Sequence, residues 1–172
     1  MRQMDAGKLT RRVAMRRAAA VLAGLGLAGC ASDPPAGGPS IPVPGQPVPA
    51  SAVHRLTAMA DRAVTVNDGR GVRWASAVVT TRAKALTSAT PGDLVPNEEK
   101  TVVYLVTVKG RFVARAASGP PGAHAPTGTY MSMVINAKTF AGLDFGLGPK
   151  PPPVAPASFG PVTYLKVNRG SR

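Results

Sequence analysis

Hydrophobic and polar positions in the last two thirds of the chain repeat with two different periods. Behind Ser51, which can cap a helix, apolar residues recur every three or four positions, and Asn67-Asp68-Gly69 then ends the pattern. This spacing predicts an amphipathic helix with polar side chains mostly on its other face. The apolar positions are Val53, Leu56, Met59 or Ala60, and Ala63 or Val64.

Segments after this helix alternate with the period of two that is typical of strands. Residues 72–80 alternate in this way, and a short helix is predicted to begin near Thr81. Residues 101–108 are β-branched or aromatic almost throughout, which indicates a central strand covered on at least one face. Lys109-Gly110 predicts a bend or bulge before the strand continues. The later predicted strands are 111–115, 129–136, 140–147 and an irregular tail or edge strand at 159–165.

This order of elements predicts the fold class. A helix, a strand, a short helix and then several antiparallel strands give an α+β domain over residues 51–172. We expect the N-terminal helix of the domain to pack on a four- or five-stranded, mainly antiparallel sheet. About 120 residues can bury one modest core.

The first 29 residues have a different pattern. A basic segment, 1–17, precedes an uninterrupted apolar segment, 18–29. Twelve helical residues extend about 18 Å, well short of the roughly 30 Å hydrocarbon core of a bilayer. The segment therefore predicts the hydrophobic part of a signal peptide rather than a membrane span.

Leu27-Ala28-Gly29-Cys30 follows directly and contains the only cysteine of the chain. The four residues resemble the lipobox of bacterial lipoproteins, whose pattern is Leu, a small residue, Gly or Ala, and Cys. The resemblance implies that a signal peptidase recognises Leu27, Ala28 and Gly29 and cuts before Cys30. It also implies a diacylglyceryl group on the Cys30 sulfur, and no metal or other cofactor is expected. Two acyl chains anchor a protein stably, whereas one gives marginal binding; the alternative for Cys30 is a small buried apolar side chain.

Thr10-Arg11-Arg12 and the residues after it resemble a twin-arginine export signal, with Ala14 where a bulky residue is expected. The alternative is an ordinary basic segment that happens to contain the pair Arg11 and Arg12. Only a twin-arginine signal would imply that the domain folds before it is exported.

Residues 30–50 read as a disordered linker behind the lipidated cysteine. Residues 31–50 hold seven prolines and three glycines, a composition that favours extended polyproline II. Such a segment reaches on the order of 60 Å and would hold the domain away from a membrane. The alternative is a ligand for a proline-recognition module.

The charge of the chain is strongly basic. The formal net charge is +13, of which +5 lies before Cys30 (six basic residues against Asp5), so +8 remains from Cys30 onwards. This charge favours anionic partners such as membrane head groups or acidic wall polymers. Aromatic residues make up only 5% and the basic residues are scattered, which argues against nucleic acid as a partner. The expected location is the extracytoplasmic face of the cell membrane.

A second resemblance covers about residues 100–165. Tyr104-Leu105-Val106-Thr107-Val108 is similar to the Tyr-x-Val-x-Val strand of PepSY-like, cystatin-like modules of exported proteins. Residues 134–139 approximate their second strand, with Asn136 in place of Asp and Phe140 in place of Gly. Gly110-Arg111-Phe112 and Pro126-Thr127-Gly128 also look like those of small lipoproteins of high-GC bacteria. The resemblance implies a binding or inhibitory module of the cell envelope without catalysis, whose partner is an envelope protein or a wall polymer.

Few residues suggest other chemistry. His54 and His124 would bind a metal only if the fold joined them with an acid, and two solvated histidines fit the spacing better. The alternative function is a small envelope enzyme or ligand carrier, whose mark would be a pocket with His124 beside an acid such as Asp144. Thr81 and Lys84 have the spacing of a serine acyl-enzyme motif but are read as a helix start.

Two further groups of residues are read as structural. Glu98 and Glu99 are adjacent in a loop and are read as a solvated cluster rather than paired catalytic carboxylates. A set of aromatic and methionine side chains could line a ligand groove, but in a small domain such residues more often form the core. Its members are Trp74, Tyr104, Phe112, Tyr130, Met131 and Met133.

Overall fold

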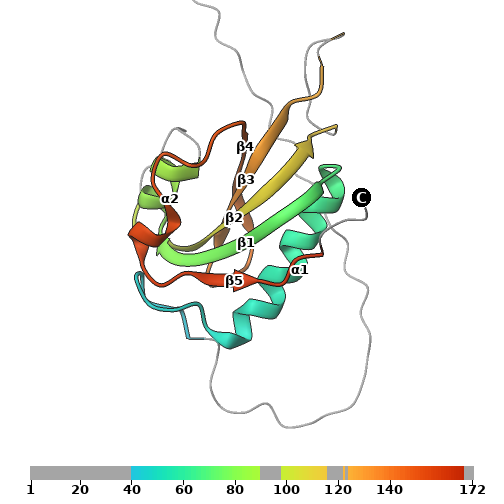
Figure 1. Ribbon diagram of the computed structural model, residues 1–172. Coiled ribbons are helices and arrows are strands. Elements are labelled where there is room, and N and C mark those ends of the chain that lie inside the picture. The colour runs from blue at the N-terminus through green and yellow to red at the C-terminus, as the bar shows by residue number, and fades with distance from the viewer. Residues whose placement is uncertain (1–39, 90–97, 116–121, 123, 169–172) are drawn as a thin grey trace, which may run out of the picture. The chain divides into compact units, whose positions relative to one another are not determined.

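A computed structural model describes residues 40–89, 98–115, 122 and 124–168 (Figure 1). Within these residues the chain forms two α-helices, a 3₁₀ helix and a five-stranded antiparallel sheet, so the α+β class is confirmed. The elements are α1 (Ala50–Val66), β1 (Arg70–Thr81), α2 (Arg82–Ala89), β2 (Val102–Val113), β3 (Thr127–Asn136), β4 (Gly142–Gly148), η1 (Pro156–Phe159) and β5 (Thr163–Leu165).

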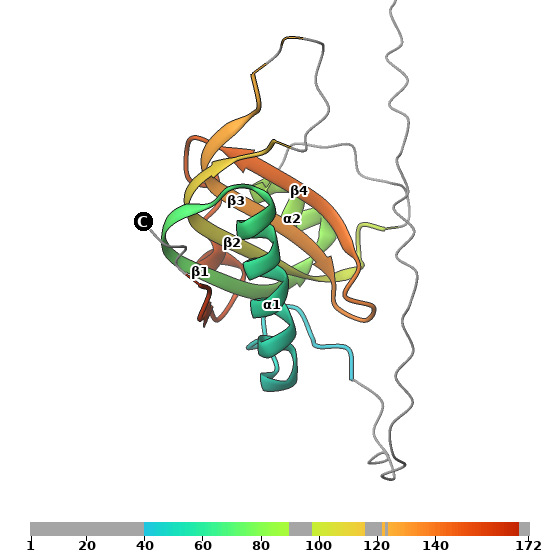
Figure 2. The same cartoon turned by 90° about the vertical axis from the view of Figure 1, so that its right-hand side faces the viewer.

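The sheet has the strand order β4-β3-β2-β1-β5. Strands β1, β2 and β3 each pair with the next strand along the chain, and β5 returns to the free edge of β1. Helix α1 lies across one face of this sheet, while α2 lies behind the other (Figures 1 and 2). The two faces of the sheet are therefore packed against different helices.

Helix α1 begins without a side-chain cap. Its N-cap residue is Pro49, whose carbonyl accepts hydrogen bonds from the backbone N–H groups of Ala52 and Val53. The prediction that Ser51 caps the helix is therefore wrong, because Ser51 already lies inside the first turn. Asn67-Asp68-Gly69 ends the helix as predicted, since Asn67 donates to the Ala63 carbonyl through both its backbone N–H and its side-chain Nδ2.

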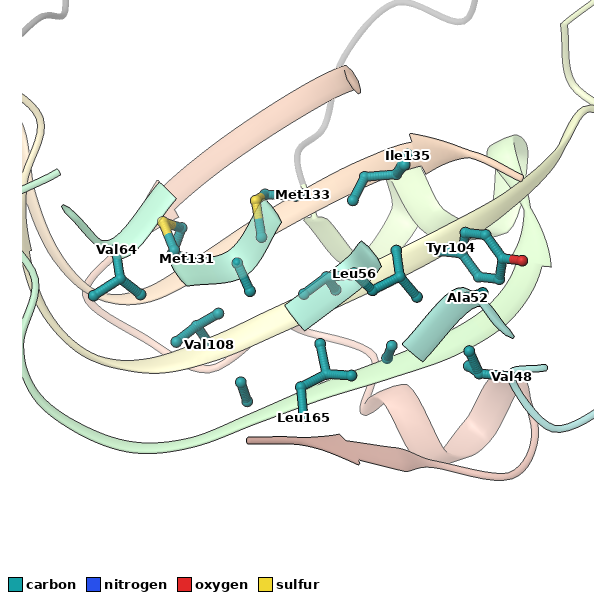
Figure 3. Packing of buried hydrophobic residues seen from close by; sticks show 14 of the residues in the cluster. Val48, Ala52, Leu56, Val64, Tyr104, Val108, Met131, Met133, Ile135 and Leu165 are labelled. Carbon is teal, nitrogen blue, oxygen red and sulfur yellow. The ribbon is translucent and has the colours of Figure 1, made fainter. Parts of the chain in front are cut away.

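The face of the sheet under α1 holds a continuous apolar core (Figure 3). Helix α1 contributes a stripe of buried residues at a spacing of four, with Leu56 fully buried at its centre. Alternate residues of β1, β2 and β3 meet this stripe, among them Val106 and Met131. The stripe consists of Ala52, Leu56, Ala60 and Val64, flanked by the partly buried Val53, Met59 and Ala63.

Residues 40–49, which the composition places in the linker, contribute to the domain. Val48 is buried in the core beneath α1. The backbone N–H of Gly45 donates to the carbonyl of Val79 on β1 at 3.0 Å. These contacts join the chain before α1 to the sheet.

The second face is covered in part by α2, η1 and the proline-rich segment between β4 and η1. A smaller apolar cluster here contains Val78, Leu105 and Val134, with Ala85 of α2 packed on it. The Ser88 hydroxyl donates to the Val154 carbonyl at 2.7 Å, which ties α2 to the proline-rich segment.

An ion-pair network fixes α2 to the sheet. The side chain of Arg82, the first residue of α2, is 7% exposed and pairs with Asp144 of β4 at 3.2 Å and with Glu98. A helix does start here as predicted, but at Arg82, because Thr81 is still the last residue of β1. Glu98 is not simply solvated as predicted, because it is an ion-pair partner of a buried arginine.

Several strand boundaries differ from the sequence prediction: β2 ends at Val113 rather than at residue 115, and Phe159 belongs to η1 rather than to the last strand. Strand β3 begins at Thr127 rather than at residue 129, and β4 begins at Gly142 rather than at residue 140. Phe140 lies instead in the turn between them with a φ of +59°. The Asn136 side chain accepts from the backbone N–H groups of Lys138 and Thr139 and so builds this turn.

The bulge predicted at Lys109-Gly110 is confirmed. The β2–β3 register shifts between Lys109 and Phe112, and the β1–β2 register shifts between Arg70 and Trp74. A Cβ on Gly110 would lie 2.9 Å from the Phe112 ring, so the bulge needs glycine at this position.

Candidate functional site

The residues of the predicted export and lipidation signals lie outside the described residues. These are Arg11, Arg12, Leu27, Ala28, Gly29 and Cys30. Among the residues that are described, no helix has the length and apolar character needed to cross a membrane.

The structure does not bring His124 and Asp144 together. His124 is exposed in the segment before β3, whereas Asp144 pairs in register with Val134 near the other end of that strand. Seven residues of strand separate Thr127 from Val134, a distance of about 23 Å. Asp144 is instead bound to Arg82.

The second histidine is also exposed, on α1. The described part of the chain contains no group of three or more His, Cys, Asp or Glu that could hold a metal.

The large side chains divide between the two faces. Tyr104, Phe112, Met131 and Met133 lie in the core under α1. Burial raises the pKa of the Tyr104 phenol above its ordinary value of 10.0 by desolvation. Trp74 and Tyr130 lie on the second face, where their rings pack edge to face with centroids 6.3 Å apart.

A row of small hydroxyl residues crosses the second face beside this aromatic pair. Ser76 pairs in register with Thr107, and Thr107 with Ser132, so that three neighbouring strands place a hydroxyl residue at the same level. All three are buried, with exposed fractions of 2%, 0% and 5%. The row continues to Gly146 on β4 and Tyr164 on β5.

Thr107 at the centre of this row has an unusual environment. Its Oγ1 is buried and has no hydrogen-bond partner among the described residues. A buried hydroxyl without a partner costs about 1–3 kcal/mol. Folding alone would therefore favour valine at this position.

A groove opens at the β5 end of the hydroxyl row. Its cavity has a volume of about 220 Å³, and its lining includes the aromatic residues Trp74 and Tyr164 and the hydroxyl residue Ser76. Tyr164 is 71% exposed, and Pro156 of η1 and Val162 also line the groove. We call this the hydroxyl–aromatic groove.

The groove can hold a ring or a short apolar chain that offers one polar group. The Trp74 and Tyr164 rings provide flat apolar surface, and the Ser76 hydroxyl can donate or accept one hydrogen bond. Lys109 and Tyr130 do not line the groove; the Lys109 Nζ lies 5.3 Å from the centroid of the Tyr130 ring. This inventory suits recognition of a ligand.

Sequence reasoning missed this site for a definable reason. The alternation does place Ser76, Thr107 and Ser132 on the side of their strands away from the apolar set. It does not give the register between strands, and only the register makes them one row.

Comparisons with known proteins add no relationship: neither a protein-family model, nor a curated protein, nor a solved structure matches this chain.

Proposed function

We propose that this chain is a lipoprotein held at the extracytoplasmic face of the cell membrane, and that its α+β domain is a non-catalytic binding or inhibitory module of the cell envelope. The observation that carries the proposal is Leu27-Ala28-Gly29-Cys30, placed between a twelve-residue apolar segment and a proline-rich segment. The covalent lipid on Cys30 is the membrane anchor. The PepSY-like relationship of residues 100–165 belongs to the same proposal.

The hydroxyl–aromatic groove supports the binding part of the proposal. Its lining offers aromatic and aliphatic surface together with the hydrogen-bonding groups of Ser76, Trp74 and Tyr164. Nucleophilic catalysis would need a base within hydrogen-bond reach of that hydroxyl. A lining of this kind holds a ligand through shape and a few hydrogen bonds.

Acyl labelling with membrane fractionation tests the anchor. In the source cell, the wild-type chain should incorporate a fatty-acid label and sediment with membranes. Cys30→Ala should lose the label and move to the soluble fraction, because no thiol remains to take the lipid. Ser32→Ala, two residues away, is the matched control and should behave as wild type. A Cys30→Ala protein that keeps its label and stays with the membranes contradicts the proposal.

The export route has its own test. If the twin-arginine route is used, replacing Arg11 and Arg12 together with lysine should block export while keeping the charge. Normal export of this variant assigns the pair to an ordinary basic segment and leaves the lipid anchor unaffected.

Site-specific photo-crosslinking in intact cells tests the binding module. A crosslinking amino acid at Tyr164, in the exposed rim of the groove, should give discrete products. The same amino acid at His54, which is exposed on α1 on the other face, should not. Equal products from both positions, or none from Tyr164, contradict a partner at this groove.

A further inference from the structure

A second concave site lies at the end of β1, β2 and β3, away from α2 and η1. The cavity of about 520 Å³ lies where α1 turns into β1, where β2 ends beyond its bulge and where β3 begins. Its charged lining residues are Arg70, Arg111, Arg115 and Asp68. We call it the arginine cleft.

The charges of the arginine cleft do not balance. Three arginines face one aspartate, which leaves a formal charge of +2. Arg70 and Arg111 are direct cross-strand partners in the β1–β2 pair. Like charges in this position destabilise a sheet. None of the ion pairs within the described residues includes Arg111.

Asp68 lies between two of the three arginines. One carboxylate oxygen of Asp68 lies 3.1 Å from a guanidinium nitrogen of Arg115, and the other lies 3.7 Å from Arg70. Asp68 adopts a φ of +48° in the turn after α1, a conformation that few non-glycine residues adopt. The turn thus holds an oxyanion between two guanidinium groups, and the third guanidinium is free to bind another.

The walls of the cleft are fixed by hydrogen bonds. The backbone N–H of Val113 on β2 donates to the Asn67 carbonyl at 2.8 Å, which ties the Asp68 turn to the sheet. On the other side, the Thr129 hydroxyl of β3 donates to the Pro149 carbonyl at 2.7 Å. A cleft held on both sides needs little rearrangement to accept a ligand.

We infer that the arginine cleft binds a phosphate-bearing polyanion. Planar guanidinium groups bind phosphate oxygens through paired hydrogen bonds, and the cavity is larger than a single phosphate needs. A ligand with two or more linked phosphates would neutralise the excess charge and relieve the repulsion between Arg70 and Arg111. This inference deepens the binding role proposed above by naming a ligand class. It rests on the described residues, so it stands apart from the lipid anchor and from the groove.

Calorimetric titration with tripolyphosphate tests the inference. The full chain carrying Cys30→Ala is used, so that no acyl group contributes. We expect saturable binding with one site, weakened at least fivefold by Arg111→Gln. Arg73→Gln removes the same charge from an exposed position on β1 outside the cleft and should change the affinity less than twofold. Equal losses in both variants, or no saturable binding, overturn the inference.

Vesicle sedimentation identifies the source of the phosphate. We expect Arg111→Gln to leave any sedimentation of the same protein with phosphatidylglycerol vesicles unchanged. This result would assign the cleft to a phosphate-bearing ligand that is not a lipid. Sedimentation that Arg111→Gln abolishes, absent with phosphatidylcholine, assigns the phosphate to lipid head groups. Absence of saturable tripolyphosphate binding overturns the inference whatever the vesicles show, while acylation of Cys30 is a separate test of the proposed function.

Discussion

Two neighbouring residues of β2 lie on opposite faces of the sheet, in two different environments. Val106 points into the continuous core under α1, whereas Thr107 points to the second face. Both are fully buried. On the α1 face every buried position of β1 to β3 is apolar or aromatic. On the second face the apolar cluster under α2 gives way to three hydroxyl residues and an aromatic pair.

The difference between the two faces separates the apolar residues that packing requires from the hydroxyl residues that it does not require. The α1 face follows from burial of apolar surface. A row of buried hydroxyl groups with one unpartnered oxygen does not improve packing. Thr107 does not line the hydroxyl–aromatic groove, so its buried hydroxyl is a polar group that packing does not explain and not a ligand contact.

The largest expected effect is on the α1 face. Leu56→Ala should lower the free energy of unfolding by about 2–5 kcal/mol, because it opens a cavity at a fully buried position. His54→Ala on the exposed side of the same helix should change it by less than about 0.5 kcal/mol. Urea unfolding of the purified protein measures both. A loss below about 1 kcal/mol for Leu56→Ala would mean that α1 does not anchor this face.

The next effect concerns the cover of the second face. Arg82→Leu leaves Asp144 and Glu98 without their cation, so stability should fall by about 1–3 kcal/mol. This is less than for a fully buried pair, because the Glu98 side chain is 46% exposed. Lys84→Leu, at an exposed position of α2, should have little effect. If the two variants unfold alike, the ion pairs do not hold α2 in place.

A smaller effect depends on pH. Since burial raises the pKa of Tyr104, the native state keeps the phenol proton after the unfolded chain begins to lose it near pH 10. The stability that this group contributes is present below pH 10 and is lost above it, at up to about 1.4 kcal/mol per pH unit. Tyr104→Phe should therefore flatten the alkaline loss of stability.

Unfolding curves between pH 9 and 11 measure this loss. Tyr164→Phe, which removes an exposed phenol, is the matched control and should leave the slope unchanged. Identical slopes for wild type and Tyr104→Phe would contradict the assignment.

Much of the fold can be predicted from local patterns. The α+β class, the bulge at Lys109-Gly110 and the helix stop at Asn67-Asp68-Gly69 all depend on neighbours in sequence. The start of α1 was missed because Pro49, and not a side chain, provides the first carbonyl. The turn at Phe140 was missed because Asn136 caps it from four residues away.

The candidate sites depend on register and could not be predicted. Ser76, Thr107 and Ser132 are separated by more than twenty residues from one another along the chain. Arg70 and Arg111 meet only because β1 and β2 pair antiparallel around a bulge. Period-two alternation gives the face of each residue but not its cross-strand partner.

The central claim is that the buried Thr107 hydroxyl on the second face lowers the free energy of unfolding. One pair of substitutions tests this claim directly. Val106→Thr and Thr107→Val exchange the same two side chains at adjacent, fully buried positions of β2. We expect Val106→Thr to lower the free energy of unfolding by about 1–3 kcal/mol and Thr107→Val to raise it by about 1 kcal/mol. If Thr107→Val instead lowers it as much as Val106→Thr does, the hydroxyl row is part of the core and the account of the second face is wrong.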